Sequence, residues 1–265
     1  CYPNKYYQCF LKKCAKKNTL ESLIMSLEMY LRNIFFHPIK NISGLVYVSH
    51  FSQKKHLAFN NKFSQLSSLI LYNFYNKTQV KDVNKKNYFL FFGRLSEEKG
   101  INTLIDAAKM QADCKFKIVG TGPLEEKIKQ QIVKDKLTNI SLLGFQTGDE
   151  LIKTIAQARF VIVPSTWYEN NPMSIIESYA QGTPVIASNI GGIPEIVKDN
   201  RTGFLIEPNS STSLSEAIVK AKNIKKQAYS LMQEEISSFF QEHFQEENHY
   251  NSLSNFYKEI IRKKI

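Results

Sequence analysis

The stretch RFVIVPSTWYENNPMSIIESYAQGTPVIAS, residues 159–188, has an apolar run at each end and a segment with helical spacing between them. The runs RFVIVPS and TPVIAS are short and flanked by turn-forming residues, which is typical of buried strands. Pro172 suits the first turn of a helix over Met173 to Gln181, because its ring fixes φ and no N–H is needed there. The stretch therefore predicts a strand, a helix and a second strand.

The same alternation repeats towards the N-terminus. Three more apolar runs read YFLFFG (88–93), KFKIVG (115–120) and NISLLG (139–144). Helical spacing occurs around them, over Ile101 to Gln111, Leu124 to Lys134 and Asp149 to Gln157. Strands that are apolar throughout are covered on both faces, so we expect an α/β fold with a doubly wound parallel sheet. Ligands of such sheets bind beyond the carboxyl ends of the strands.

The composition is that of a globular protein, with 265 residues of which 43% are hydrophobic. This length allows one or two domains. The sequence has no run of 18 apolar residues and no charged-then-apolar leader, so we expect a cytoplasmic protein. The whole formal surplus of +11 lies in the first 86 residues, which hold 14 Lys or Arg and three acids. Nucleic acid, an anionic membrane, a phosphorylated substrate or simple solvation would all suit that charge.

The basic first part of the chain contains an expected helix from Leu20 to Phe36. We expect its apolar stripe to pack in a core, while the neighbouring lysines keep a membrane contact open. The stripe consists of Leu20, Leu23, Ile24, Leu27, Tyr30, Leu31, Ile34 and Phe35.

Strands are expected at Gly44 to Ser49 and Ser68 to Asn73, with Ser49 or Ser52 capping the helix between them. The polar stretch from Asn76 to Asn87 has no apolar periodicity and is interpreted as a linker. We therefore expect three parts. Residues 1–78 would be what remains of an N-terminal domain, 79–240 a ligand-binding domain and 241–265 a closing helix.

The cysteines are Cys1, Cys9, Cys14 and Cys114. The first three do not have the C-x2-C spacing of zinc sites, nor do they resemble a secreted disulfide framework. We expect reduced thiols and no metal.

The loops that follow the strands carry cations, glycines and an aromatic residue. Arg94 and Lys99 follow the first strand of the sheet and would attract an anion. Gly120 and Gly122 follow the next and allow close backbone approach, with Pro123 starting the following helix. Phe145 follows the third and offers a flat surface near a base. All of these strand ends should converge on one crevice.

Two carboxylates, Glu169 and Glu177, stand on either side of Pro172. Glu169 would lie in the loop and Glu177 just over one turn inside the helix, so both can face the crevice. An ionised carboxylate accepts hydrogen bonds from adjacent hydroxyls, and a nucleoside diphosphate sugar offers such groups on its ribose and on its sugar. We expect one glutamate for each.

Two familiar phosphate motifs are missing. The segment GTGPLE has Glu125 where a dinucleotide-binding loop requires its third glycine, and no G-x4-G-K-[ST] occurs. Hydride transfer and triphosphate hydrolysis are therefore disfavoured. Paired cations also suit a departing diphosphate, since they stabilise the charge that grows as the bond breaks.

Several segments of the sequence together resemble glycosyltransferase family 4, over about Tyr88 to Ala221. They are GRLSEEKG, VGTGP, LLGF, the E-x7-E pair in ENNPMSIIE, AQGTPVIAS and GGIPEIV. The resemblance implies a GT-B fold, in which two Rossmann-like domains face a cleft and the C-terminal one binds the donor. Members of this family are typically retaining and independent of metals.

The resemblance also implies roles for residues of the donor site. Arg94 and Lys99 would bind the diphosphate and, with Glu169 at the transferred sugar, act in catalysis. Glu177 would bind the ribose. The amides around Asn171, Pro172, Met173 and Ser174, and those of Gly191 and Gly192, would hold sugar and phosphate oxygens. Gly93, Gly120, Gly122 and Phe145 complete the predicted site.

The expected partners are a nucleotide-sugar donor and a polysaccharide or lipid-linked acceptor, with no metal or cofactor. Residues 1–86 could contact the anionic inner face of a membrane, where a lipid-linked acceptor lies. Nucleic acid is not expected, because the lysines lack an interleaved aromatic platform. The chain opens at Cys1, after the family's histidine motif should have occurred. An alternative is therefore a truncated remnant that binds a nucleotide sugar without transferring it.

Overall fold

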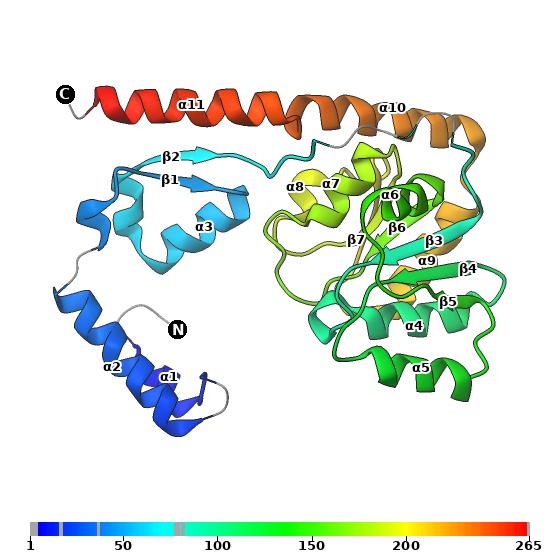
Figure 1. The fold of residues 1–265 in the computed structure, drawn as a ribbon, viewed down its shortest axis with the longest axis horizontal. Coiled ribbons are helices and arrows are strands. Elements are labelled where there is room, and N and C mark those ends of the chain that lie inside the picture. The colour runs from blue at the N-terminus through cyan, green and yellow to red at the C-terminus, as the bar shows by residue number, and fades with distance from the viewer. Residues whose placement is uncertain (1–4, 16–17, 36–37, 77–79, 81–82, 264–265) are drawn as a thin grey trace. The chain divides into compact units, whose positions relative to one another are not determined.

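The computed structural model describes residues 5–15, 18–35, 38–76, 80 and 83–263 (Figure 1). Backbone contacts divide the chain into two compact units. The first unit runs up to Leu71 and includes the residues from Ser254 on, and the second unit runs from Tyr72 to Leu253. The helix α11 (Glu246–Arg262) begins in the second unit and ends in the first.

The second unit is built on a parallel sheet with the strand order β5-β4-β3-β6-β7-β8. The order reverses between β3 and β6, so the sheet is doubly wound as predicted, and its switch point lies between these two strands. The strands are β3 (Tyr88–Phe92), β4 (Lys115–Val119), β5 (Ile140–Leu142), β6 (Phe160–Val163), β7 (Val185–Ser188) and β8 (Gly203–Ile206).

Helices cover both faces of this sheet, with α4 and α5 on one side and α6 and α7 on the other (Figure 1). The helix α9 packs beside α4, and α10 beside α7. The helical elements are η3 (Glu97–Lys99), α4 (Ile101–Met110), α5 (Glu125–Lys134), α6 (Gly148–Gln157), α7 (Met173–Ala180), α8 (Ile193–Ile196), α9 (Ser211–Lys222) and α10 (Lys226–His243). The elements β8, α9 and α10 were not predicted from the sequence. The helix predicted over Leu124 to Lys134 forms as α5, but Pro123 does not start it, because Leu124 caps the helix and Glu125 begins it.

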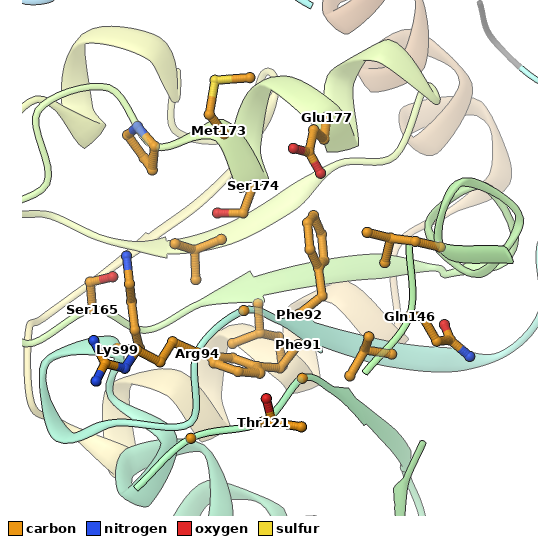
Figure 2. A pocket seen from close by; sticks show the side chains of 18 of the residues that line it. Phe91, Phe92, Arg94, Lys99, Thr121, Gln146, Ser165, Met173, Ser174 and Glu177 are labelled. Carbon is orange, nitrogen blue, oxygen red and sulfur yellow. The ribbon is translucent and has the colours of Figure 1, made fainter. Parts of the chain in front are cut away.

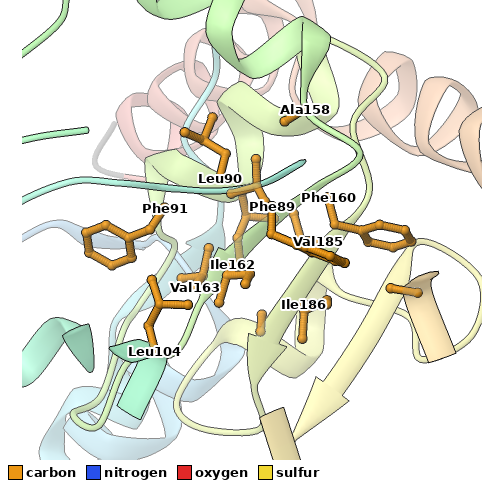
Figure 3. Packing of buried hydrophobic residues seen from close by; sticks show 14 of the residues in the cluster. Phe89, Leu90, Phe91, Leu104, Ala158, Phe160, Ile162, Val163, Val185 and Ile186 are labelled. Atoms are coloured by element: carbon orange, nitrogen blue, oxygen red, sulfur yellow. The ribbon is translucent and has the colours of Figure 1, made fainter. Parts of the chain in front are cut away.

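A row of phenylalanine rings crosses the sheet and fixes its interior. Phe116, Phe89, Phe160 and Phe204 stack in sequence with ring centroids 5.6, 6.3 and 5.7 Å apart. Each ring is at least nine-tenths buried, and burying such a side chain contributes about 1.5–3 kcal/mol. Figure 3 shows Phe89 and Phe160 within this packing. The packed interior gives the loops at the strand ends a rigid base.

The first unit contains one strand–helix–strand element. The strands β1 (Gly44–Tyr47) and β2 (Ser67–Ile70) are parallel, and the end of α11 packs so closely on β1 that a Cβ at Gly44 would lie 2.4 Å from Ile260 Cδ1. Of the two serines predicted as helix caps, Ser49 caps the helix α3, and its side chain accepts a hydrogen bond from the Ser52 N–H. The remaining elements are α1 (Tyr7–Leu11), α2 (Thr19–Phe35), η1 (Pro38–Asn41), α3 (His50–Phe59) and η2 (Asn61–Gln65).

The helix α2 forms where it was predicted, but the expectation that its apolar stripe packs in a core is wrong. The reason is that α1 packs on the face where Ser22 and Ser26 are buried. Of the predicted stripe, only Tyr30 reaches this face, with its ring 5.1 Å from that of Tyr6. The exposed apolar side chains of α2 are Leu20, Leu23, Ile24, Met25, Leu27, Leu31, Ile34 and Phe35.

Cys9 and Cys114 are buried, Cys14 is exposed, and all three are free thiols. Cys1 lies outside the described residues. Within the described part of the chain, we find no helix of the length and hydrophobicity needed to cross a bilayer.

Candidate functional site

A cavity of about 820 Å³ opens at the carboxyl ends of β3 and β6, beside the switch point of the sheet. This volume lies in the range of small-molecule sites. Its lining includes all of the predicted site residues except Gly191 and Gly192. Those present are Gly93, Arg94, Lys99, Gly120, Gly122, Phe145, Glu169, Asn171, Pro172, Met173, Ser174 and Glu177.

An ion pair links the two loops that flank the switch point. The Lys99 ammonium lies 2.6 Å from Glu169 Oε1, and the hydroxyl of Ser165 donates to the same oxygen over 3.0 Å. The Glu169 side chain is only 18% exposed. Two hydrogen bonds therefore fix this carboxylate before any ligand arrives.

Backbone contacts hold the same two loops together. The N–H of Thr166 donates to the backbone oxygen of Glu98, and its hydroxyl donates to that of Glu97, each over 3.0 Å. Gly100 has φ +71, and a Cβ there would lie 1.7 Å from the Pro164 oxygen. Only glycine allows η3 to dock this closely on the end of β6, which is what brings Lys99 to Glu169.

Apart from the Lys99–Glu169 ion pair, the charged side chains of the pocket lie at different ends. In Figure 2, Arg94 and Lys99 project from one end of the cavity, while the Glu177 carboxylate projects from α7 at the other. The carboxyl of Glu98 has a lowered pKa because the Ser96 hydroxyl donates to it and because Arg94 and Lys99 lie nearby. Burial, and next the Glu177 charge, raise the pKa of Tyr75 to about 12. The cavity therefore has one end with two cations, of which Lys99 is paired with Glu169, and another end with the Glu177 carboxylate; the first is called the cationic end below.

The glycines after β3 and β4 serve the packing of the loops on one another. A Cβ at Gly120 would lie 1.9 Å from the Gly93 oxygen, and one at Gly122 would lie 2.5 Å from the Leu95 oxygen. At Gly120 and Gly122, the close approach seen in the structure is to the backbone of Gly93 and Leu95 in the neighbouring loop. Both residues still line the cavity.

Gly191 and Gly192 do not line the cavity but lie against the backbone of Glu169. A Cβ at Gly191, where φ is +65, would lie 2.3 Å from the Glu169 oxygen. The N–H of Gly192 donates to that same oxygen over 2.7 Å. This amide is therefore used to fix the Glu169 backbone, whereas the sequence analysis had assigned it to ligand oxygens.

Sequence reasoning missed part of the pocket wall. Ser165 was not predicted, although it lies two residues after the end of β6, where a polar residue would face the crevice. The other residues that were not anticipated include an apolar floor and two polar side chains. They are Phe91, Phe92, Val119, Thr121, Pro123, Gln146, Leu151, Ile162 and Val163.

The arrangement suits an elongated ligand with an anionic part and a hydroxyl-rich part. Arg94 and Lys99 can hold an anion, Glu169 and Glu177 can accept hydrogen bonds from hydroxyls, and apolar side chains can contact flat rings. Across the residues that the structure describes, no three or more His, Cys, Asp or Glu side chains gather in a way that could hold a metal ion.

The model of the family described as "Glycosyl transferases group 1" matches residues 75–236. The chain belongs to this family. The match takes in the whole six-stranded sheet and the cavity, and it begins at Tyr75, close to the start of the second unit.

Relatives with curated names agree with this assignment. The chain is 34% identical over 203 residues to an uncharacterized glycosyltransferase of Methanocaldococcus jannaschii, covering 77% of this chain and 56% of that protein. It is 32% identical over 149 residues to a UDP-Gal:alpha-D-GlcNAc-diphosphoundecaprenol alpha-1,3-galactosyltransferase of Escherichia coli, covering 53% of this chain and 38% of that protein. The matches thus take in little more than half of the first relative and less than half of the second.

The crystal structure of Anabaena HepE in complex with UDP and glucose has a TM-score of 0.70 to this chain at 24% identity. The likeness covers 82% of this chain and 63% of that one. It confirms the α/β, GT-B type fold expected from the sequence.

Proposed function

We propose that the second unit binds a nucleoside diphosphate sugar and that the protein transfers the sugar, with retention of configuration, to a polysaccharide or lipid-linked acceptor. The observation that carries this proposal is the meeting of Arg94, Lys99, Glu169 and Glu177 around one cavity at the switch point of the sheet. Family membership supports it.

The cationic end of the cavity is the place for the diphosphate. Arg94 offers a planar fork of donors and Lys99 a point charge, and both are suited to phosphate oxygens. As the bond between sugar and phosphate breaks, negative charge grows on the departing diphosphate. Cations that are already in place stabilise that charge without reorganisation.

The two glutamates divide the hydroxyl groups of the donor. Glu177 accepts from the ribose diol, and Glu169, fixed by Lys99 and Ser165, accepts from a hydroxyl of the transferred sugar. The backbone from Asn171 to Ser174 contacts sugar oxygens. Phe145 is 72% exposed at the cavity wall and provides a surface for the base.

The names of two similar proteins indicate the chemistry of the donor and the acceptor. The E. coli relative is named for a UDP-galactose donor and a diphosphoundecaprenol-linked acceptor, and HepE was crystallised with UDP and glucose. We infer a donor and an acceptor of the same chemical classes here.

A lipid-linked acceptor would bring the protein to a membrane surface. The exposed apolar side chains of α2 and the basic residues of 1–86 together favour contact with an anionic bilayer. Liposome sedimentation tests this. We expect more protein to sediment with vesicles that contain phosphatidylglycerol than with neutral phosphatidylcholine vesicles, and equal sedimentation would count against membrane contact.

Calorimetry tests the donor site. The chain is titrated with UDP, GDP and ADP and with UDP-glucose and GDP-mannose. We expect one nucleotide series to bind, with free glucose as a non-binding control. If no nucleoside diphosphate binds at millimolar concentration, the donor assignment fails.

A further inference from the structure

The short segment from Tyr72 to Tyr75 contacts α8 and the loop between β6 and α7, although none of its residues lines the cavity. The Tyr72 hydroxyl donates to Glu195 of α8 over 3.3 Å. Asn73 bonds to Asn171 in the loop between β6 and α7. The phenol of Tyr75 lies within electrostatic reach of the Glu177 carboxylate. No motif in the sequence pointed to this segment.

Asn73 and Asn171 form a reciprocal pair of hydrogen bonds. The backbone N–H of Asn73 donates to Asn171 Oδ1 over 2.7 Å, and Asn73 Nδ2 donates to the backbone oxygen of Asn171 over 3.1 Å. The pair fixes both the main chain and the side chain of Asn171. Since an N–H must face an oxygen, it also fixes which end of the Asn171 amide carries the nitrogen.

That nitrogen has no hydrogen-bond partner among the described residues, although it is buried. Asn171 is 6% exposed and lines the cavity. A buried amide donor without an acceptor is unfavourable, and such groups in native structures call for an explanation. A hydroxyl oxygen of a bound sugar is an acceptor of the kind that this donor lacks.

The loop from Glu169 to Ser174 is thus held at two points by separate parts of the chain. Lys99, Ser165 and Gly192 hold Glu169 at its start. Asn73 holds Asn171, two residues further on. Loss of the second point would leave the glutamate in place and free the backbone that follows it.

We propose that Asn73 is a positioning residue for the donor sugar. It holds Asn171 so that the backbone of 171–174 and the unpaired Nδ2–H of Asn171 serve the sugar hydroxyls. This role rests on the proposed function. Because a preformed loop loses less freedom on binding, Asn73 strengthens binding of the sugar without touching it. The diphosphate, held by Arg94 and Lys99, does not depend on this loop.

The proposal predicts that a change at Asn73 weakens binding of the nucleotide sugar but not of the bare nucleoside diphosphate. General destabilisation of the chain would weaken binding of both ligands. The variant Asn73→Asp keeps the shape of the side chain but replaces its Nδ2–H by an oxygen that repels the Asn171 carbonyl. The matched control is Asn76→Asp, which makes the same charge change three residues on, at an exposed position. Calorimetry measures UDP-glucose and UDP, or GDP-mannose and GDP if the wild-type chain prefers guanine.

We expect Asn73→Asp to weaken binding of the nucleotide sugar about tenfold, as loss of a hydrogen bond allows, and to change binding of the nucleoside diphosphate by less than about twofold. Asn76→Asp should change neither. Equal weakening of both ligands by Asn73→Asp would overturn the proposal, and so would the same pattern in the control.

Hydrogen exchange of the unliganded chain provides a second readout. Asn73→Asp should speed exchange of the amides of Asn171, Met173 and Ser174 about tenfold, and Asn76→Asp should not. Unchanged exchange would overturn the positioning role alone. If the wild-type chain binds no nucleotide sugar, the proposed function fails and the role of Asn73 in sugar binding fails with it.

Discussion

The Lys99 ammonium lies 2.6 Å from the Glu169 carboxylate, although 70 positions separate them in the sequence. The pair joins the loop after β3 to the loop after β6, and these two strands flank the switch point. The cation that we propose for phosphate and the carboxylate that we propose for the sugar therefore hold each other in place in the unliganded protein. Substituting either residue should affect both parts of the donor.

Lys99→Met should weaken binding of the nucleoside diphosphate about tenfold or more, because a charge-assisted contact to phosphate is lost. Calorimetry measures the affinity. The matched control is Lys129→Met, which removes a lysine paired with Glu125 at 2.9 Å on α5, away from the cavity lining. A Lys99 variant that binds like the control would contradict the assignment of the diphosphate to the cationic end.

Glu177→Gln should weaken binding of the nucleotide about tenfold, since the ribose diol loses a charged acceptor. Combining Glu177→Gln with the 2′-deoxy nucleotide gives a double-mutant cycle, in which one change removes the carboxylate and the other removes a ribose hydroxyl. We expect wild-type protein to lose affinity for the deoxy nucleotide and Glu177→Gln to lose little more. Fully additive losses would mean that Glu177 does not contact the ribose.

Trp167 should report on occupation of the sugar part of the site. It is the single tryptophan of the chain, its side chain is 68% exposed, and it lies two residues before Glu169. A nucleotide sugar should change its emission more than the bare nucleotide does. Trp167→Phe gives the background signal. Emission of Trp167 that stays unchanged with both ligands would contradict a sugar site beside this residue.

The stability of the folded chain should rise with pH above neutrality through Lys85. Its ammonium donates to the Thr183 hydroxyl over 2.5 Å, and burial lowers its pKa from 10.5 to about 7. Between these two values the unfolded chain binds more protons than the folded one, so the free energy of unfolding increases with pH. Denaturant unfolding between about pH 6.5 and 9.5, below the ordinary tyrosine pKa, measures the slope.

Lys85→Met should remove this part of the pH dependence and raise the free energy of unfolding at neutral pH. Lys86→Met, one residue on and exposed, should keep the wild-type slope. The same slope in all three proteins would show that Lys85 is solvated and ordinarily charged.

If Arg94 and Lys99 neutralise the leaving diphosphate as proposed, removal of divalent metals should not reduce transfer of the sugar. Release of the nucleoside diphosphate is measured before and after treatment with EDTA. Activity that disappears with EDTA and returns with Mg²⁺ or Mn²⁺ would contradict a role of these two side chains as sufficient cations.

Much of the second unit could be predicted because its determinants are local. Runs such as FVIV at 160–163 are apolar at every position, which indicates a strand covered on both faces. In a parallel sheet the carboxyl ends of the strands share one edge, so residues placed directly after strands, such as Arg94 and Glu169, could be grouped before any distance was known.

Contacts between distant segments were not predictable in the same way. The apolar stripe of α2 indicates an amphipathic helix, yet periodicity does not say which face finds a partner, and α1 packs on the serine face instead. Gly192 looks like part of an anion-binding turn, but the backbone oxygen of Glu169 takes its N–H. Asn73 carries no signature at all, because its role depends on a residue 98 positions away.

The sequence by itself determined the alternation of strands and helices from β3 to β7, the doubly wound class of the sheet and most of the loops that line the cavity, since these follow from local periodicity and from the geometry of parallel strands. The tertiary structure alone decided which groups pair within that set. Lys99 meets Glu169, Gly192 supports the Glu169 backbone and Asn73 holds Asn171. Hydrogen bonds depend on tenths of an ångström between segments, and only the packed chain fixes distances at that scale.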